Sequence, residues 1–163
     1  MSPVALPQFL SHLKVYGGYP VPFTQMWIDG KPDFRVMDAV RVEQCVREKL
    51  CAICGRPLGE FAYFIGGPRS KENHVFADPA MHERCADFAS RTCPFVSGNK
   101  HGYSDRPVGG DDVVTVRIAE MVSSHRPAIM YILKTRTKKI TAGIMGESLM
   151  IQAGPWVGEK VIE

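Results

Sequence analysis

Two pairs of metal-ligating residue types stand at matched spacing in the middle of the chain. Two residues separate Cys51 from Cys54, and two separate His82 from Cys85; the 27 residues of 55–81 lie between the pairs. Thiolates and imidazoles at this spacing bind Zn²⁺ tetrahedrally, and a Cys₃His set leaves no coordination position for water or substrate. The sequence therefore predicts a closed, structural zinc site formed by these four residues.

The residues around each pair predict how the ligands are presented. Gly55 directly follows the first pair and can adopt positive φ, so we expect a tight knuckle whose backbone amides face the thiolates. Asp78 and Pro79 are typical of the N-cap and first turn of a helix, here expected over residues 80–91. The second ligand pair would then share one side of the helix near its N-terminus.

Two further cysteines lie near these pairs. Cys93 follows the second pair closely, and its thiolate is an alternative ligand should His82 point away. Cys45 falls on the apolar face of an amphipathic helix expected over residues 39–50 with Asp38 as N-cap, so it is expected to be a core residue. Cysteines at metal spacing, with no secretory signal expected, predict a reducing compartment, the cytoplasm.

Composition is typical of a folded domain. The chain has 163 residues, of which 45% are hydrophobic and 23% charged, enough apolar material for a core and for one compact domain. The longest apolar run, residues 128–133, is far shorter than the roughly 20 residues of a membrane-spanning helix, so no membrane partner is expected.

Local patterns predict two hairpins in the first 96 residues. Asp29-Gly30 stands between apolar runs at residues 23–28 and 34–37, a strong hairpin signal. Residues 61–65 and 74–76 predict two more strands, joined by a polar loop into the second hairpin.

The rest of the chain has β character. Three strands are expected over residues 128–133, 139–142 and 148–152. We expect them to form a C-terminal antiparallel meander, within residues 113–163, packed beside the hairpin, helix and zinc module of residues 1–96. The glycine-rich residues 97–112 are expected to be a flexible loop between the two parts. The predicted fold class is α+β.

The order of knuckle, hairpin and ligand-bearing helix, over about residues 50–92, resembles a treble-clef zinc module. A wider resemblance, over about residues 16–96, is to small zinc-knuckle proteins of bacteriophage and bacterial genomes, a group of unsettled activity. It rests on residues 18–22, 29–35, 51–59 and 82–89. The resemblance implies a bound metal and a phage or prophage context, and no particular reaction.

Catalytic motifs are weak in this sequence. The P-loop, the nucleophile elbow, the His-Glu-x-x-His motif and the zinc-deaminase pattern are absent. Many His-Asn-His nucleases have a treble-clef core, and His74 stands near the place of their general base. However, Asn73 precedes it, and the distal catalytic histidine has no clear counterpart. His74 is otherwise a polar residue at a strand end, so we favour a non-enzymatic protein over a degenerate nuclease.

Two surfaces are candidates for binding. A basic cluster is either a solvated strand face or a phosphate-contacting stripe; it consists of Lys134, Arg136, Lys138 and Lys139. An aromatic segment is either an interface or a small core under the first hairpin; its candidate anchors are Tyr16, Tyr19, Trp27 and Arg35. We therefore expect a zinc-stabilised interaction protein that binds a host or phage protein, with nucleic-acid binding as the alternative.

Overall fold

The fold is mixed α+β, with small antiparallel sheets and few helices. A computed structural model describes residues 5–92, 127–145 and 148–162. The helices are η1 (Gln8–Leu10), α1 (Ala39–Glu48), α2 (Pro68–Asn73), α3 (Glu83–Thr92) and η2 (Thr137–Lys139). The strands are β1 (Val15–Tyr16), β2 (Tyr19–Pro20), β3 (Gln25–Ile28), β4 (Lys31–Met37), β5 (Phe61–Gly66), β6 (Val75–Phe76), β7 (Met130–Arg136), β8 (Thr141–Met145), β9 (Ser148–Gln152) and β10 (Gly158–Ile162). Among the described helices, none is long and apolar enough to cross a membrane.

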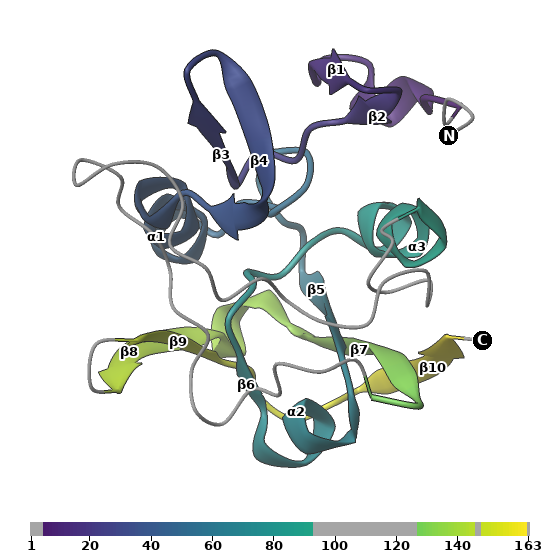
Figure 1. Cartoon of the computed structure of the whole chain (residues 1–163). Coiled ribbons are helices and arrows are strands. Elements are labelled where there is room, and N and C mark those ends of the chain that lie inside the picture. The colour runs from purple at the N-terminus through teal and green to yellow at the C-terminus, as the bar shows by residue number, and fades with distance from the viewer. Residues whose placement is uncertain (1–4, 93–126, 146–147, 163) are drawn as a thin grey trace.

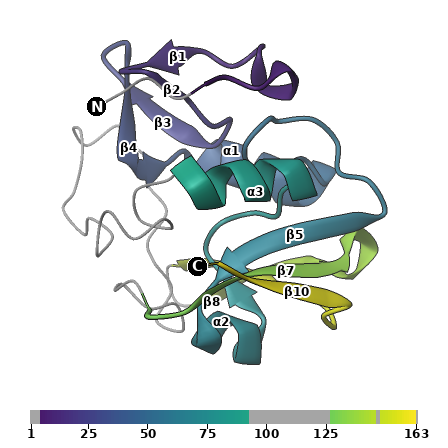
Figure 2. The ribbon, with the colours of Figure 1, turned by 90° about the vertical axis from the view of Figure 1, so that its right-hand side faces the viewer.

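The strands form two hairpins and two three-stranded sheets. β1 pairs with β2 and β3 with β4, while the sheets have the strand orders β10-β7-β5 and β6-β9-β8. Helices α1 and α3 lie between the N-terminal hairpins and the β10-β7-β5 sheet (Figures 1 and 2). Of the predicted metal ligands, Cys51 and Cys54 follow α1 in the chain, His82 directly precedes α3, and Cys85 lies in α3.

The N-terminal predictions are confirmed. Asp29 and Gly30 both have positive φ, 52° and 77°, as the two-residue turn between β3 and β4 requires. The Asp38 side chain accepts hydrogen bonds from the backbone N–H groups of Val40 and Arg41, which caps α1 at its N-terminus. Both features are local, because each needs only neighbouring residues.

The hairpin predicted between residues 61–65 and 74–76 is wrong. β5 pairs along its whole length with β7, whereas β6 pairs with β9. The connecting residues are not a loop but contain α2, which has Pro68 in its first turn and ends at His74 in the left-handed conformation. Alternate residues of β5 are buried and the others are half-buried, so both faces of the strand are covered. β5 has six residues and β6 only two, so β7 rather than β6 can pair with β5 along its whole length.

α3 begins at Glu83, three residues later than predicted, and Asp78 is not its N-cap. Tertiary hydrogen bonds hold the preceding residues extended. The Ala80 carbonyl accepts from the Ala52 N–H, and Met81 exchanges two hydrogen bonds with Tyr63. These bonds to distant strands outweigh the local helix signal.

The C-terminal strands do not form a separate meander. β8 and β9 pair as expected, but β9 also pairs with β6, and β7 lies at the centre of a sheet between β5 and β10. Each three-stranded sheet therefore combines one strand from the middle of the chain with two from the C-terminal part. The expected loop at residues 97–112 and the residues up to 126 lie outside the described part.

Among the described residues, two large core clusters lie on opposite sides of the β10-β7-β5 sheet. Phe64 and Leu133 belong to the first, in which the Phe64 ring stacks on Phe76 with centroids 4.4 Å apart. Ile132 belongs to the second, which also contains the cysteines of both predicted ligand pairs. The alternation of side chains along β5 and β7 thus brings apolar residues against both clusters.

Asp78, a half-buried residue in the loop before α3, gives a testable pH dependence. Burial raises the pKa of Asp78 from 3.8 to about 6. A carboxyl whose folded pKa is raised makes the protein less stable as pH rises from about 4 through about 6. We expect Asp78→Asn to raise the free energy of unfolding by about 2–3 kcal/mol at pH 7.5 and by less at pH 5. Urea unfolding at both pH values measures this, with Asp29→Asn in the exposed hairpin turn as the control. A gain of equal size at both pH values would contradict it.

Candidate metal centre

Four side chains converge on one point between the knuckle and α3. One ligand atom from each of Cys51, Cys54, His82 and Cys85 lies within 4.8 Å of all the others. His82 Nδ1 is 3.3 Å from Cys54 Sγ and 3.9 Å from Cys85 Sγ. Ligands of a tetrahedral zinc ion, at 2.0–2.3 Å from the metal, are about 3.5–3.8 Å apart. The four residues predicted from spacing are therefore close enough to hold one metal ion.

The knuckle depends on Gly55, which has φ of +75°. Its N–H donates to the Cys51 carbonyl over 2.9 Å, closing the turn that presents the first pair. A Cβ at this position would also lie 2.8 Å from the ring of Phe23. Conformation and space thus both require glycine here.

The second pair is oriented by α3 and by a backbone carbonyl. His82 immediately precedes the helix, and its Nε2 lies 2.9 Å from the Pro57 carbonyl oxygen. Because a carbonyl only accepts, Nε2 carries the proton and Nδ1 presents its lone pair to the thiolates. Cys85 is fully buried in the first turn of α3.

Without a metal, the three thiols share their protons unequally. Hydrogen bonds with Cys51 and Cys85 lower the pKa of Cys54 well below its usual range. The pKa of Cys51 is raised by its hydrogen bond with Cys54, and that of Cys85 by its hydrogen bond with Cys51. Because a cysteine binds a metal as the thiolate, any thiol proton of the cluster must leave when a metal binds, so metal affinity is expected to fall as pH falls.

The surroundings of the cluster are apolar and closely packed. Its nearest buried neighbours are Leu10, Met81, Ala86, Phe88 and Ile132. Cys45 lies behind the knuckle, where its thiol donates to the Cys51 carbonyl over 3.9 Å. Burial raises the pKa of Cys45 to about 12, so this thiol stays protonated. Cys45 is thus a core residue, as predicted.

Other predicted metal or catalytic residues stand apart. Cys93 lies outside the described residues. His74 ends α2, where its ring stacks on Trp156 with centroids 4.6 Å apart and its Nδ1 is 2.8 Å from the Gly154 carbonyl oxygen. The Asn73 side chain accepts from the Val75 N–H. The described residues near His74 thus contain no metal-ligand group, and its ring serves packing.

The basic cluster is not one continuous stripe. Lys134 and Arg136 share a face of β7, but the strand ends there and Lys138 and Lys139 lie in the exposed turn η2. The turn forms because buried Thr137 donates its N–H to Glu60 and its hydroxyl to Gly59. Local alternation could not predict this tertiary contact.

The cations on β7 already have partners. Lys134 Nζ lies 4.3 Å above the Phe61 ring, and Arg136 forms a 3.0 Å ion pair with Glu60. Arg136 also lies over the Phe61 ring. Both residues are half-buried rather than fully solvated.

The aromatic segment is partly exposed. Trp27 is half-buried, with Lys14 Nζ 5.3 Å from its ring centroid, whereas Tyr16 and Phe34 are 42% and 50% exposed. The side chain of Arg35 lies outside the described part. The segment is therefore half-buried at Trp27 and exposed at Tyr16 and Phe34.

Sequence reasoning missed an open groove beside the metal centre. It has a volume of about 790 Å³ and lies between α3 and the β10-β7-β5 sheet; its lining includes Tyr63, His82, Arg84, Asp87, Lys134 and Lys160. These residues come from four elements and a loop that are distant in the sequence. No local signal could have assembled them.

No family model, curated protein or solved structure matches this chain. The treble-clef and phage resemblances therefore stay predictions, and the ligand geometry is the main guide to function.

The cluster predicts which cysteines are required for folding. Cys51→Ser and Cys85→Ser should each abolish metal binding and lower the free energy of unfolding by several kcal/mol, because metal-binding energy in such sites is folding energy. Native mass spectrometry and thermal melting measure both effects. Cys45→Ala is the matched control, expected to retain the metal and to cost about 1–2 kcal/mol. Melting like the wild type in both serine variants would contradict a structural metal.

The knuckle predicts a specific requirement for glycine. Gly55→Ala should lower the free energy of unfolding by about 1–3 kcal/mol, because it combines a left-handed backbone with contact against Phe23. Gly59→Ala, where a Cβ meets nothing within 4 Å, is the control. Equal stability of the two variants in urea unfolding would show that the knuckle tolerates a side chain.

Proposed function

We propose that this chain is a non-enzymatic protein-binding module whose fold is closed by one structural zinc ion. The observation that carries the proposal is the complete Cys₃His set, in which the three cysteines are buried and His82 is half-buried. Four protein ligands fill a tetrahedral site, and such a site stabilises structure rather than activating water. Zinc is favoured over other ions because three thiolates and an imidazole suit a tetrahedral, redox-inactive metal.

The order of elements supports a treble-clef-like relationship only in part. A knuckle carries the first ligand pair; of the second pair, His82 directly precedes α3 and Cys85 lies in its first turn. The central hairpin of such a module is replaced by β5, α2 and β6, whose strands pair elsewhere. We propose a treble-clef-like site within a larger fold that borrows strands from the C-terminal part.

Binding of a protein is favoured over catalysis. Within the described residues, the Cys₃His set is the one metal-ligand group, and the His74 ring is engaged with Trp156. The degenerate nuclease would need a further, exchangeable metal near His74. Its catalytic role therefore lacks support from the geometry.

Protein is also favoured over nucleic acid as the partner. Arg136 is paired with Glu60, and the remaining basic residues do not form a single line for phosphates. Exposed Tyr16 and Phe34 instead provide the aromatic character that protein interfaces use. The resemblance to small zinc-knuckle proteins of phage and bacterial genomes points to a host or phage protein in the cytoplasm as the partner.

Metal content and partner capture test this proposal together. Native mass spectrometry should find one zinc ion per chain, and its chelation should unfold the protein. Tagged wild-type chain should retain a protein partner after nuclease treatment and in high salt, whereas Cys51→Ser should not.

Two results would contradict it. Capture of nucleic acid with steep salt dependence would support the nucleic-acid alternative. A second, exchangeable divalent ion, with DNA cleavage lost on His74→Ala, would support a nuclease.

A further inference from the structure

The groove beside the metal centre is elongated. Its floor is formed by β7 and β10, and one side by α3. A second hollow of about 570 Å³ continues it along α3 toward Ser90 and Arg91 and along β10 toward Val161 and Ile162. Asp87, Ile132 and Lys160 line both hollows, so the two hollows adjoin one another.

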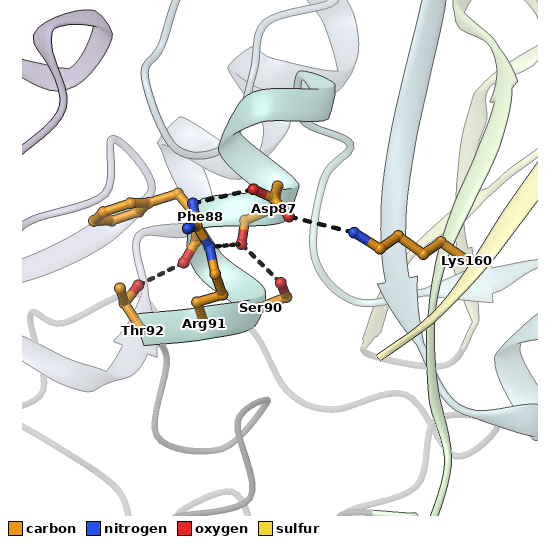
Figure 3. A network of polar contacts seen from close by, with 6 residues as sticks. All are labelled: Asp87, Phe88, Ser90, Arg91, Thr92 and Lys160. Atoms are coloured by element: carbon orange, nitrogen blue, oxygen red, sulfur yellow. Dashed lines mark hydrogen bonds and ion pairs between the residues drawn. The ribbon is translucent and has the colours of Figure 1, made fainter. Parts of the chain in front are cut away.

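Each carboxylate along the groove already has a partner. Asp87 pairs with Arg91 over 3.0 Å and with Lys160 over 3.6 Å, and the latter contact links α3 to β10 (Figure 3). Glu159 pairs with Lys71 over 2.6 Å, and Glu83 accepts a hydrogen bond from Tyr63. Asp87 and Glu159 are therefore paired with cations of the protein, whereas Glu83 contacts only a neutral hydroxyl group.

Two cationic side chains that line the groove have no carboxylate partner among the described residues. Arg84 lies with its guanidinium carbon 4.7 Å from the Phe9 ring centroid, and Lys134 lies over the rings of Phe61 and Tyr63. Within the described part of the chain, neither forms an ion pair. They face the groove from different elements, α3 and β7. Aromatic contacts hold the two charges in place and leave them available to an anion.

We propose that this groove binds an extended acidic peptide segment of a partner protein, with carboxylates received by Arg84 and Lys134. The proposal rests on the proposed function and names its binding surface. Besides the two cations, the groove offers apolar contact through Ile132 and Ile162. An extended peptide, whose side chains alternate, can present carboxylates to the cations and apolar groups to the floor.

Two observations favour a peptide over a nucleic acid. Glu83, Asp87 and Glu159 line the groove and would repel a phosphate backbone, which carries a charge at every unit. β10 is also an outer strand of its sheet among the described strands, so its outer edge offers backbone N–H and C=O groups to a peptide. A peptide can place its few charges away from the acidic side chains.

Peptide titration tests the proposal on the full-length, metal-loaded chain. The probe is a fluorescein-labelled peptide of alternating Glu and Val, about ten residues long, which matches the length of an extended strand. An alternating Lys–Val peptide and an oligothymidylate of similar length serve as comparison probes. Anisotropy gives affinity, and backbone amide shifts locate the site.

The expected result is binding of the Glu–Val peptide alone, with shifts in α3 and β10. Arg84→Gln and Lys134→Gln should each weaken it about tenfold, the effect of losing one charge-assisted hydrogen bond. Lys138→Gln, an exposed basic position in η2, is the matched control and should change little. Unchanged metal content in all variants shows that folding is intact.

Three outcomes would overturn the groove as an acidic-peptide site. These are affinity unchanged in both groove variants, tighter binding of the oligothymidylate through the same two residues, and no amide shifts in α3 or β10 at about millimolar peptide.

Partner capture separates failure of this inference from failure of the proposed function. If wild type and the Arg84→Gln, Lys134→Gln double variant retain a protein equally well, the groove is not its binding site. The proposal of a protein-binding module would still hold. Absence of any retained protein, even with the wild type, would contradict the module itself.

Discussion

The convergence of three thiols and one imidazole is the interaction on which the rest of the structure depends. The knuckle formed by residues 51–54 is hydrogen-bonded to three other segments of the chain. Ala52 and Ile53 accept hydrogen bonds from the backbone of residues 23 and 24, and Ala52 donates to Ala80. His12 reaches the Cys54 carbonyl at 2.8 Å. Segments that precede and follow α1 therefore meet at the ligands, and a bound metal would stabilise all of them at once.

The metal centre and the groove share a side chain but have different roles. His82 presents Nδ1 to the thiols, while its ring also lines the groove. The ligand cluster fixes the N-terminal end of α3 against the knuckle, and the Asp87–Lys160 contact links its middle to β10. A metal bound at one end would thus help to set the width of the groove, together with a surface ion pair further along. Because exposed ion pairs contribute little, a bound metal would be the stronger of the two constraints.

The central sheet explains why this small chain has two cores. β7 pairs with β5 on one edge and β10 on the other, so a strand from the C-terminal part is inserted beside one from the middle. Phe64 and Leu133 face one cluster, and Ile132 faces the cluster around the cysteines. This arrangement is non-local, since the pairing of β5 with β7 joins residues about 70 positions apart in the sequence. It also places Lys134 beside Tyr63, which forms part of the groove.

The sequence by itself determined the features that depend on neighbouring residues. The ligand spacing, the knuckle at Gly55, the Asp29-Gly30 turn and the Asp38 cap were all predictable, because each is satisfied within a few positions. Tertiary structure alone decided the partners of β5 and β6, the late start of α3, the end of the basic strand at η2 and the existence of the groove. In each of these cases hydrogen bonds or burial against distant strands outweighed a local preference, and local preference is all that a pattern of neighbouring residues can express.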